Sequence, residues 1–122
     1  MGLYFRNTTG STVTLVLASY DTDCLGDCSD SPYLKKGWYT VPPGGTTKVW
    51  SGAVYGERFY FYAHSDVRTW SGQNDPKRRF SEVSPYRFEF CWCVADTNSY
   101  TVGFAHLAPA SFPTVDRTVS LT

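Results

Sequence analysis

The sequence predicts an all-β protein, a single antiparallel β-sandwich of about eight strands with a jelly-roll-like arrangement, over residues 1–122. Three observations predict this fold class. Apolar residues recur with a period of two along most of the chain, and no helical apolar stripe of useful length is present. Turn residues separate these runs about every eight to twelve residues, as in sandwiches. Aromatic residues make up 17% of the chain, which is typical of a globular β-rich protein and not of a disordered one.

Turn clusters separate the strands that we expect in the first half of the chain. The first strand ends at Asn7-Thr8-Thr9-Gly10, and the third ends sharply at Pro42-Pro43-Gly44-Gly45. In the second strand, Val13, Leu15 and Leu17 share one face. In the fifth, Phe59, Phe61 and Ala63 do the same, and we expect Phe61 and the Trp38 of the third strand to lie in the core. The five expected strands cover residues 3–6, 11–20, 35–41, 46–50 and 57–64.

The second half of the chain begins with a polar stretch. Residues 65–79 contain few apolar side chains and are expected to form a loop. Alternation then returns in RFEFCWCV, SYTVGFAHL and VDRTVSLT, which predict strands over residues 87–94, 99–107 and 115–122. No internal repeat, low-complexity tract or domain linker divides the chain, so one domain is expected.

Five stretches occur in an order that resembles a known family. They are LYFRNTTGSTVTLVLASYD, KKGWYTVPPGG, RFYFYAHSD, TWSG and the closing RTVSLT. This order resembles the bacterial family called domain of unknown function 1036, and the resemblance spans nearly the whole chain. It implies a fold and supplies no reaction. Family members often carry a cysteine after the Pro-Gly turn, whereas Thr46 and Thr47 stand there in this chain.

The cysteines predict a tethered loop. The stretch DTDCLGDCSD, residues 21–30, holds Cys24 and Cys28, and Cys91 and Cys93 follow much later. Neighbouring same-face Cβ atoms of a strand lie about 6–7 Å apart, so Cys91 and Cys93 are not expected to bridge each other. We expect disulfides that pair one or both of them with Cys24 and Cys28. Four cysteines allow three connectivities, and the sequence does not choose between them.

Metal binding is the alternative interpretation of the same loop, although we expect no cofactor. Asp21, Asp23 and Gly26 match three positions of an EF-hand calcium loop, but Leu25 and Pro32 stand where oxygen ligands belong. The four cysteines would supply enough thiolates for a tetrahedral zinc site, although their spacing is poor. A calcium site of another kind would use Asp21, Asp23, Asp27 and Asp30.

Catalysis and binding to nucleic acid have little support. The chain has two histidines, His64 and His106, and neither lies in a nucleophile motif. Ser65 and Asp66 follow His64 directly, but adjacent strand residues project to opposite faces. We therefore predict that the protein is not an enzyme. Lys plus Arg and Asp plus Glu both number 11, and this balance argues against a nucleic-acid partner and against attraction to an acidic membrane surface.

Aromatic side chains favour ligand binding instead. Ten of them exceed what a small core comfortably hides, because indole N–H and phenol O–H groups need partners. These ten are Trp38, Tyr39, Trp50, Tyr55, Tyr60, Tyr62, Trp70, Tyr86, Trp92 and Tyr100. The loop WSGQNDPKRR places an aromatic ring beside polar and charged groups, and we predict that it recognises a carbohydrate or protein ligand. The predicted ligand-binding residues are Trp70, Gln73, Asn74, Asp75, Arg78 and Arg79.

These observations together predict a non-catalytic interaction module, extracellular or at the cell surface. Four cysteines favour an oxidising compartment over the cytoplasm, although the N-terminus shows no signal peptide. One alternative is a structural protein that assembles with itself into a filament or ordered oligomer through β-edges or disulfides, with residues 3–6 and 115–121 as candidate edge strands. Another alternative is a membrane-active sandwich of the small cytolysin type, in which exposed Trp and Tyr engage the lipid interface.

Overall fold

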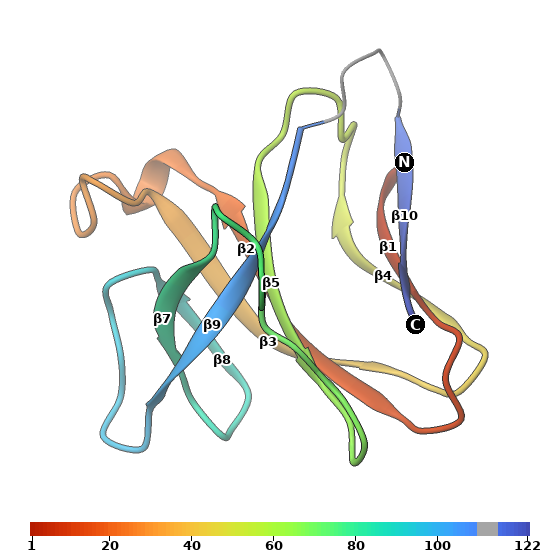
Figure 1. Cartoon of the computed structure of the whole chain (residues 1–122). Helices are drawn as coiled ribbons and strands as arrows, with labels where there is room; N and C mark the ends of the chain where they lie inside the picture. Colours follow the sequence, from red (N-terminus) through yellow and green to blue (C-terminus); the bar gives the residue numbers. More distant parts are fainter. Residues whose placement is uncertain (110–114) are drawn as a thin grey trace.

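The computed structural model describes residues 1–109 and 115–122, and strands dominate this part of the chain. Two sheets pack face to face, which confirms the predicted β-sandwich (Figure 1). A single turn of 3-10 helix, η1 (Thr22–Cys24), interrupts the strands. The ten strands are β1 (Gly2–Asn7), β2 (Val13–Tyr20), β3 (Tyr33–Val41), β4 (Thr46–Ser51), β5 (Phe59–His64), β6 (Thr69–Trp70), β7 (Arg79–Val83), β8 (Phe88–Cys91), β9 (Tyr100–Leu107) and β10 (Asp116–Leu121).

Two of these strands are absent from the sequence prediction. Strand β6 has two residues and pairs with β5 inside the segment that we expected to be a loop. Strand β7 pairs with β9 along its whole length, but only Ser81 and Val83 of its side chains are buried. Val83 is the one buried apolar residue among the five of β7, so this segment shows no clear apolar alternation from which to predict a strand. Strand β8 is also shorter than expected, because it ends at Cys91.

The strand order in the smaller sheet corrects two expectations. This sheet has the order β10-β1-β4, so β1 is its central strand and not an edge. Strand β10 is an edge, as predicted, but it runs parallel to β1, with Gly2 opposite Asp116 and Asn7 opposite Leu121. The sandwich is therefore not wholly antiparallel. Parallel neighbours need a long connection, and here the rest of the chain between the two strands supplies it.

The larger sheet curls on itself. Its order is β7-β9-β5-β2-β3-β8, with β6 added beside β5, and Figure 1 shows its outer strands β7 and β8 bending to the same side. Its convex face packs on the smaller sheet and its concave face encloses a second set of side chains, so two hydrophobic clusters result. Strand β2 contributes side chains to both clusters, because successive residues of a strand point to opposite faces. Leu15 and Leu17 lie in the cluster between the sheets, and Val16 and Ala18 lie in the cluster within the curl.

The two predicted core aromatics belong to different clusters. Phe61 is 8% exposed between the sheets, where its ring lies edge-on to Phe5 at a centroid distance of 5.0 Å. Trp38 is only half-buried and packs against the cluster within the curl. Its indole N–H donates to the carbonyl of Ser84 at 2.8 Å. The core assignment is confirmed for Phe61, and Trp38 lies at the border of the core.

A buried lysine spans the opening of the curl. Lys35 of β3 is 0% exposed, and its ammonium donates to the carbonyl oxygen of Glu82 in β7 and to that of Val94, at 3.1 Å, beyond β8. Burial lowers the pKa of Lys35 to about 8, although the nearby Glu82 charge raises it in part. The Ser81 hydroxyl donates to the Trp92 carbonyl at 2.7 Å across the same opening. Side chains therefore connect the two outer strands where no backbone ladder does.

Candidate functional site

The loop predicted to recognise a ligand is largely occupied by contacts within the protein. The Arg78 guanidinium donates to the Ser71 carbonyl at 2.7 Å and lies over the Phe80 ring at 4.6 Å. Arg79 donates to the Ser31 hydroxyl and lies over the Trp92 ring at 5.0 Å. Arg78 thus connects the loop within itself and to β7, while Arg79 connects it to residues just before β3 and just after β8.

The remaining predicted residues of this loop have similar roles. Asp75 accepts the backbone N–H of Lys77 at 2.9 Å and that of His106 at 3.0 Å, and the bond from Lys77 contributes most to holding its pKa below the usual value. Gln73 accepts the Ser71 N–H at 3.2 Å, and Asn74 takes the left-handed conformation of a tight turn. Trp70 is half-buried against the cluster between the sheets. Ligand binding by this loop stays a prediction.

The cysteines form the predicted disulfides. Cys24 bonds to Cys91, and Cys28 bonds to Cys93, so both cysteines of the acidic loop are joined to the end of β8. This pairing is one of the three that the sequence allowed. It also overturns the zinc alternative, because no thiolate is left to ligate a metal ion.

The aspartates of the tethered loop do not form a metal site. Asp21 accepts the backbone N–H of Asp23 at 2.9 Å and thereby caps η1. Asp23, Asp27 and Asp30 are exposed. In residues 1–109 and 115–122, no three acidic, histidine or cysteine side chains are grouped so that they could hold a metal ion. The calcium alternative therefore finds no support, and DTDCLGDCSD is a disulfide-tethered loop.

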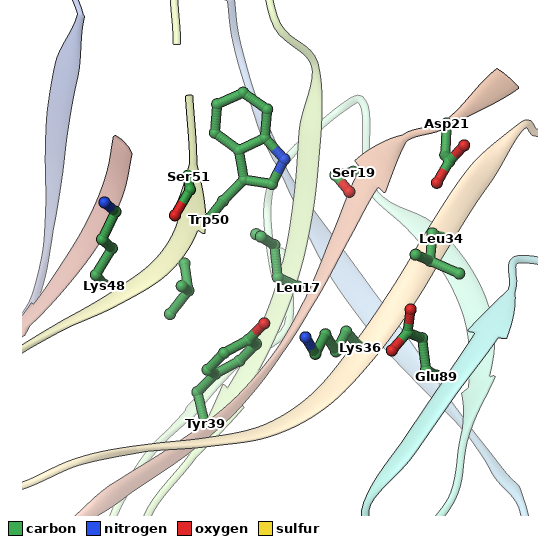
Figure 2. Close-up of a pocket in the computed structure, with 11 residues that line it drawn as sticks. Leu17, Ser19, Asp21, Leu34, Lys36, Tyr39, Lys48, Trp50, Ser51 and Glu89 are labelled. Carbon is green, nitrogen blue, oxygen red and sulfur yellow. The ribbon is translucent and has the colours of Figure 1, made fainter. Parts of the chain in front are cut away.

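A cavity of about 490 Å³ lies where the two sheets diverge, between β4 on one side and β2 and β3 on the other (Figure 2). We call it the groove. Its volume falls within the range of small-molecule sites. Figure 2 shows Trp50 and Tyr39 along the groove with Leu17 between them, and the Lys36 and Glu89 side chains extending into the same part of it. The lining residues are Leu17, Ser19, Asp21, Leu34, Lys36, Tyr39, Lys48, Val49, Trp50, Ser51 and Glu89.

A bulge in β3 brings Tyr39 into the groove. Strand β3 pairs with β2 so that Tyr39 lies opposite Leu15 and Gly37 lies opposite Val16, which leaves Trp38 as an extra residue. An extra residue inverts the alternation of everything that follows it. Tyr39 therefore faces the same side as Lys36, while Trp38 turns to the cluster within the curl.

Close packing requires glycine next to this bulge. A Cβ on Gly37 would lie 2.8 Å from a methyl carbon of Val16 and 2.9 Å from the ring of Phe88, and both distances are shorter than real contacts allow. Neither neighbour is free to move, because Val16 is 0% exposed and Phe88 is 6% exposed. Gly37 thus lets β2, β3 and β8 approach closely enough to hold the bulge in place.

Several polar side chains of the groove have no partner among the described residues. Lys36 and Glu89 lie opposite each other in the register of β3 and β8, yet neither side chain makes a hydrogen bond or an ion pair there. The Tyr39 hydroxyl is likewise without a hydrogen bond there. Burial raises the pKa of Tyr39, Glu89 raises it further and Arg87 lowers it, so the phenol stays a neutral donor at neutral pH.

A second cavity of about 310 Å³ adjoins the groove and shares Lys36 and Tyr39 with it. Its other lining residues are Gly37, Trp38 and Arg87. Strand β8 pairs with β3 only from Leu34 to Gly37, so this cavity lies where β3 continues past the end of its neighbour. Groove and cavity together follow β3 around its bulge.

The sequence indicated two of the aromatic residues of this site, but it did not indicate that they lie in one groove. Tyr39 and Trp50 belong to the aromatic excess that predicted binding, but nothing in the sequence places them beside each other. No sequence pattern predicts a binding role for the charged residues Lys36, Lys48 and Glu89, because single charged residues on alternating strands are usually solvated. The pairing of β3 with β8 brings Lys36 and Glu89 together, and the packing of the two sheets adds Lys48 from β4.

Comparisons with protein-family models, with curated proteins and with solved structures found no match to this chain. The resemblance to the family of unknown function therefore stays a prediction. Among the described residues, no helix is long and apolar enough to cross a membrane.

Proposed function

We propose that the protein is a non-catalytic, extracellular interaction module that binds a carbohydrate in the groove between β4 and β3. The observation that carries this proposal is the pairing of two half-buried aromatic rings, Tyr39 and Trp50, with hydrogen-bonding groups that have no partner in the described part of the chain. Sugars present flat C–H faces together with hydroxyl groups, and they need both kinds of surface in one site.

The two rings are held firmly enough to act as a platform. Trp50 packs edge-on to Phe59 at a centroid distance of 5.2 Å, and Phe59 is 1% exposed. Tyr39 packs against the same cluster between the sheets. Rigid aromatic side chains lose little conformational entropy when a ligand binds, so their contact surface contributes efficiently to affinity.

The polar lining supports a sugar over an apolar ligand. Toward a ligand, the Lys36 ammonium can donate hydrogen bonds and the Glu89 carboxylate can accept them. The hydroxyl groups of Ser19 and Ser51 can do both. A site of this composition satisfies vicinal hydroxyl groups, each of which is donor and acceptor at once. The same lining contains neither a histidine nor a cysteine, and its two carboxylates, Asp21 and Glu89, come from different elements.

The extracellular part of the proposal rests on the disulfides. All four cysteines are paired, and disulfides persist in oxidising compartments. The two bonds fix the loop between β2 and β3 beside the end of β8, and Asp21 at the start of this loop lines the groove. The test is alkylation of the protein taken directly from cells, in which labelled thiols would contradict an extracellular location.

Binding is tested by isothermal titration calorimetry with a panel of neutral and acidic oligosaccharides. Tyr39→Leu removes the ring and the hydroxyl group from the groove, and we expect at least a roughly tenfold loss of affinity, about 1.4 kcal/mol. Tyr86→Leu is the matched control, because Tyr86 is 65% exposed and lies outside the groove. Equal affinity in wild type and Tyr39→Leu, or no binding of any oligosaccharide by wild type, would overturn the proposal.

Self-assembly is a second candidate function, and the position of β10 favours it. Within the described residues, this strand pairs with β1 on one side and with no strand on the other. It contains no lysine or proline, the residues that commonly protect an exposed edge from pairing with another chain. A second copy that adds a strand there would extend the smaller sheet. This surface is separate from the groove, so assembly and carbohydrate binding are compatible.

A further inference from the structure

The smaller cavity beside the groove differs from the groove in its charge. Lys36 and Arg87 line it, and no acidic residue does, whereas Asp21 and Glu89 both line the groove. Glu89 lies opposite Lys36 in the register of β3 and β8 but does not line this cavity, so the lining itself carries two positive charges and no negative one. Its volume of about 310 Å³ accommodates a small ring.

Both cations remain available to a ligand. In residues 1–109 and 115–122, neither the Lys36 ammonium nor the Arg87 guanidinium makes a hydrogen bond or an ion pair. This distinguishes Arg87 from Arg78 and Arg79, whose guanidinium groups are engaged with serine groups and aromatic rings. An arginine with free donors presents a planar fork that matches a carboxylate.

The walls of the cavity are aromatic and well fixed. Trp38 is held by its bond to the Ser84 carbonyl and lies edge-on to Phe88 at a centroid distance of 6.3 Å. Tyr39 follows it directly, and the bulge sends the two rings to opposite sides of β3. Both rings line the cavity from the exposed edge of β3, together with the two cations, so a ligand ring bound there meets apolar surface and positive charge in one site.

We propose that this cavity is a subsite for a sugar ring that carries a carboxylate, so that the groove selects acidic oligosaccharides, such as those built from uronic acids, over neutral ones. The inference rests on the proposed carbohydrate-binding function. The carboxylate is bound by the Arg87 guanidinium and the Lys36 ammonium, and the ring packs against Trp38 and Tyr39. Because Lys36 and Tyr39 line both the cavity and the groove, one oligosaccharide can place its acidic ring in the cavity and its neighbouring sugars in the groove.

The test compares ligands that differ only in charge. Tetramers of galacturonic, glucuronic and mannuronic acid are titrated calorimetrically alongside their methyl esters, which keep the ring and remove the negative charge. We expect at least one acid to bind roughly tenfold or more tightly than its ester. That difference should shrink when the salt concentration is raised, since screening weakens exposed charge pairs.

Variants assign the preference to the cavity. Arg87→Gln should lower the affinity for the acid roughly tenfold and leave the affinity for the ester unchanged, while Arg87→Lys, which keeps the charge and loses the planar fork, should retain only part of the preference. Arg87 is exposed, so both variants should fold, and their thermal midpoints verify it. Arg6→Gln is the control, because Arg6 is an exposed cation on β1 that lines neither cavity.

The possible failures are distinguishable. If every acid and its ester bind equally, or if Arg87→Gln weakens both equally, the carboxylate subsite is overturned while carbohydrate binding in the groove stands. If sulfated neutral sugars bind as tightly as the acids, the cavity recognises anions in general and the carboxylate assignment is overturned. If no oligosaccharide binds, acidic or neutral, the subsite and the proposed function fall together.

Discussion

The buried Lys35 ammonium makes the stability of this protein depend on pH in an unusual direction. Its pKa is lowered from 10.5 to about 8 because the folded protein removes it from water. Below pH 8 the group is charged in both folded and unfolded chains, and burial of that charge destabilises the fold. Between pH 8 and 10.5 the folded protein releases the proton and the unfolded chain retains it, so the free energy of unfolding rises with pH.

The magnitude follows from the two pKa values. A difference of 2.5 units corresponds to about 3 kcal/mol when the transition is complete, at about 1.36 kcal/mol per unit. Integrated from pH 7 to pH 9.5, the expected gain is about 2 kcal/mol. The comparison stops at pH 9.5 because burial raises the pKa of several tyrosines, and their ionisation in the unfolded chain destabilises the fold above about pH 10.

Urea unfolding followed by tryptophan fluorescence at pH 7 and pH 9.5 measures this effect. Lys35→Met keeps the length of the side chain and removes the titrating group, so its free energy of unfolding should not rise between the two pH values. Lys77→Met, which removes an exposed lysine, should retain the full rise. All four cysteines are bonded, so no thiol starts disulfide exchange at the higher pH. A wild type without the rise, or a Lys35→Met variant that retains it, would show that Lys35 does not cause this pH dependence.

Three further predictions concern the bulge, the disulfides and the open edge. Gly37→Ala should destabilise the protein by about 1–3 kcal/mol through overpacking, while Gly10→Ala, whose added Cβ would meet nothing within 4 Å, should change little in the same urea unfolding measurement. Replacing all four cysteines with Ala should lower the free energy of unfolding by at least about 4 kcal/mol, because the two bonds close overlapping loops with sequence separations of 67 and 65 residues; a loss below 1 kcal/mol would contradict the chain-entropy account. If β10 mediates assembly, light scattering should show an oligomer, and Thr118→Lys should dissociate it. The thermal midpoint of this variant should be unchanged, because Thr118 is exposed. A wild-type monomer at high concentration would exclude assembly through β10.

The faces of the central strands were determined by the sequence alone. The alternation in β2 and β5 assigns Leu15, Leu17, Phe59 and Phe61 to one side, and all four lie in the cluster between the sheets. This works because the side chains of a strand alternate whatever the strand's neighbours are, so local order suffices. The opposite sides of these strands also carry apolar or aromatic residues, and only the curl of the larger sheet shows that they are covered within the protein.

Strand order, by contrast, was decided only by the tertiary structure. The segment 3–6 was predicted as an edge strand because it lies near the chain terminus, yet β1 is central because β10 returns beside it from the far end of the chain. The disulfides show the same limit, since the sequence restricted four cysteines to three pairings and the fold selected Cys24 with Cys91 and Cys28 with Cys93. Contacts between distant segments depend on which strands pair, and periodicity carries no information about that.

The candidate site depends on a single local departure from regular pairing. Simple alternation along β3 would send Tyr39 to the side of Lys35 and Trp38 to the side of Lys36, and the extra residue opposite the junction of Leu15 and Val16 reverses both. A bulge is a property of two paired strands and leaves no periodic trace in one of them. The sequence therefore determined that aromatic and charged residues alternate along this strand, and only the register of β2 with β3 decided which of them meet in the groove.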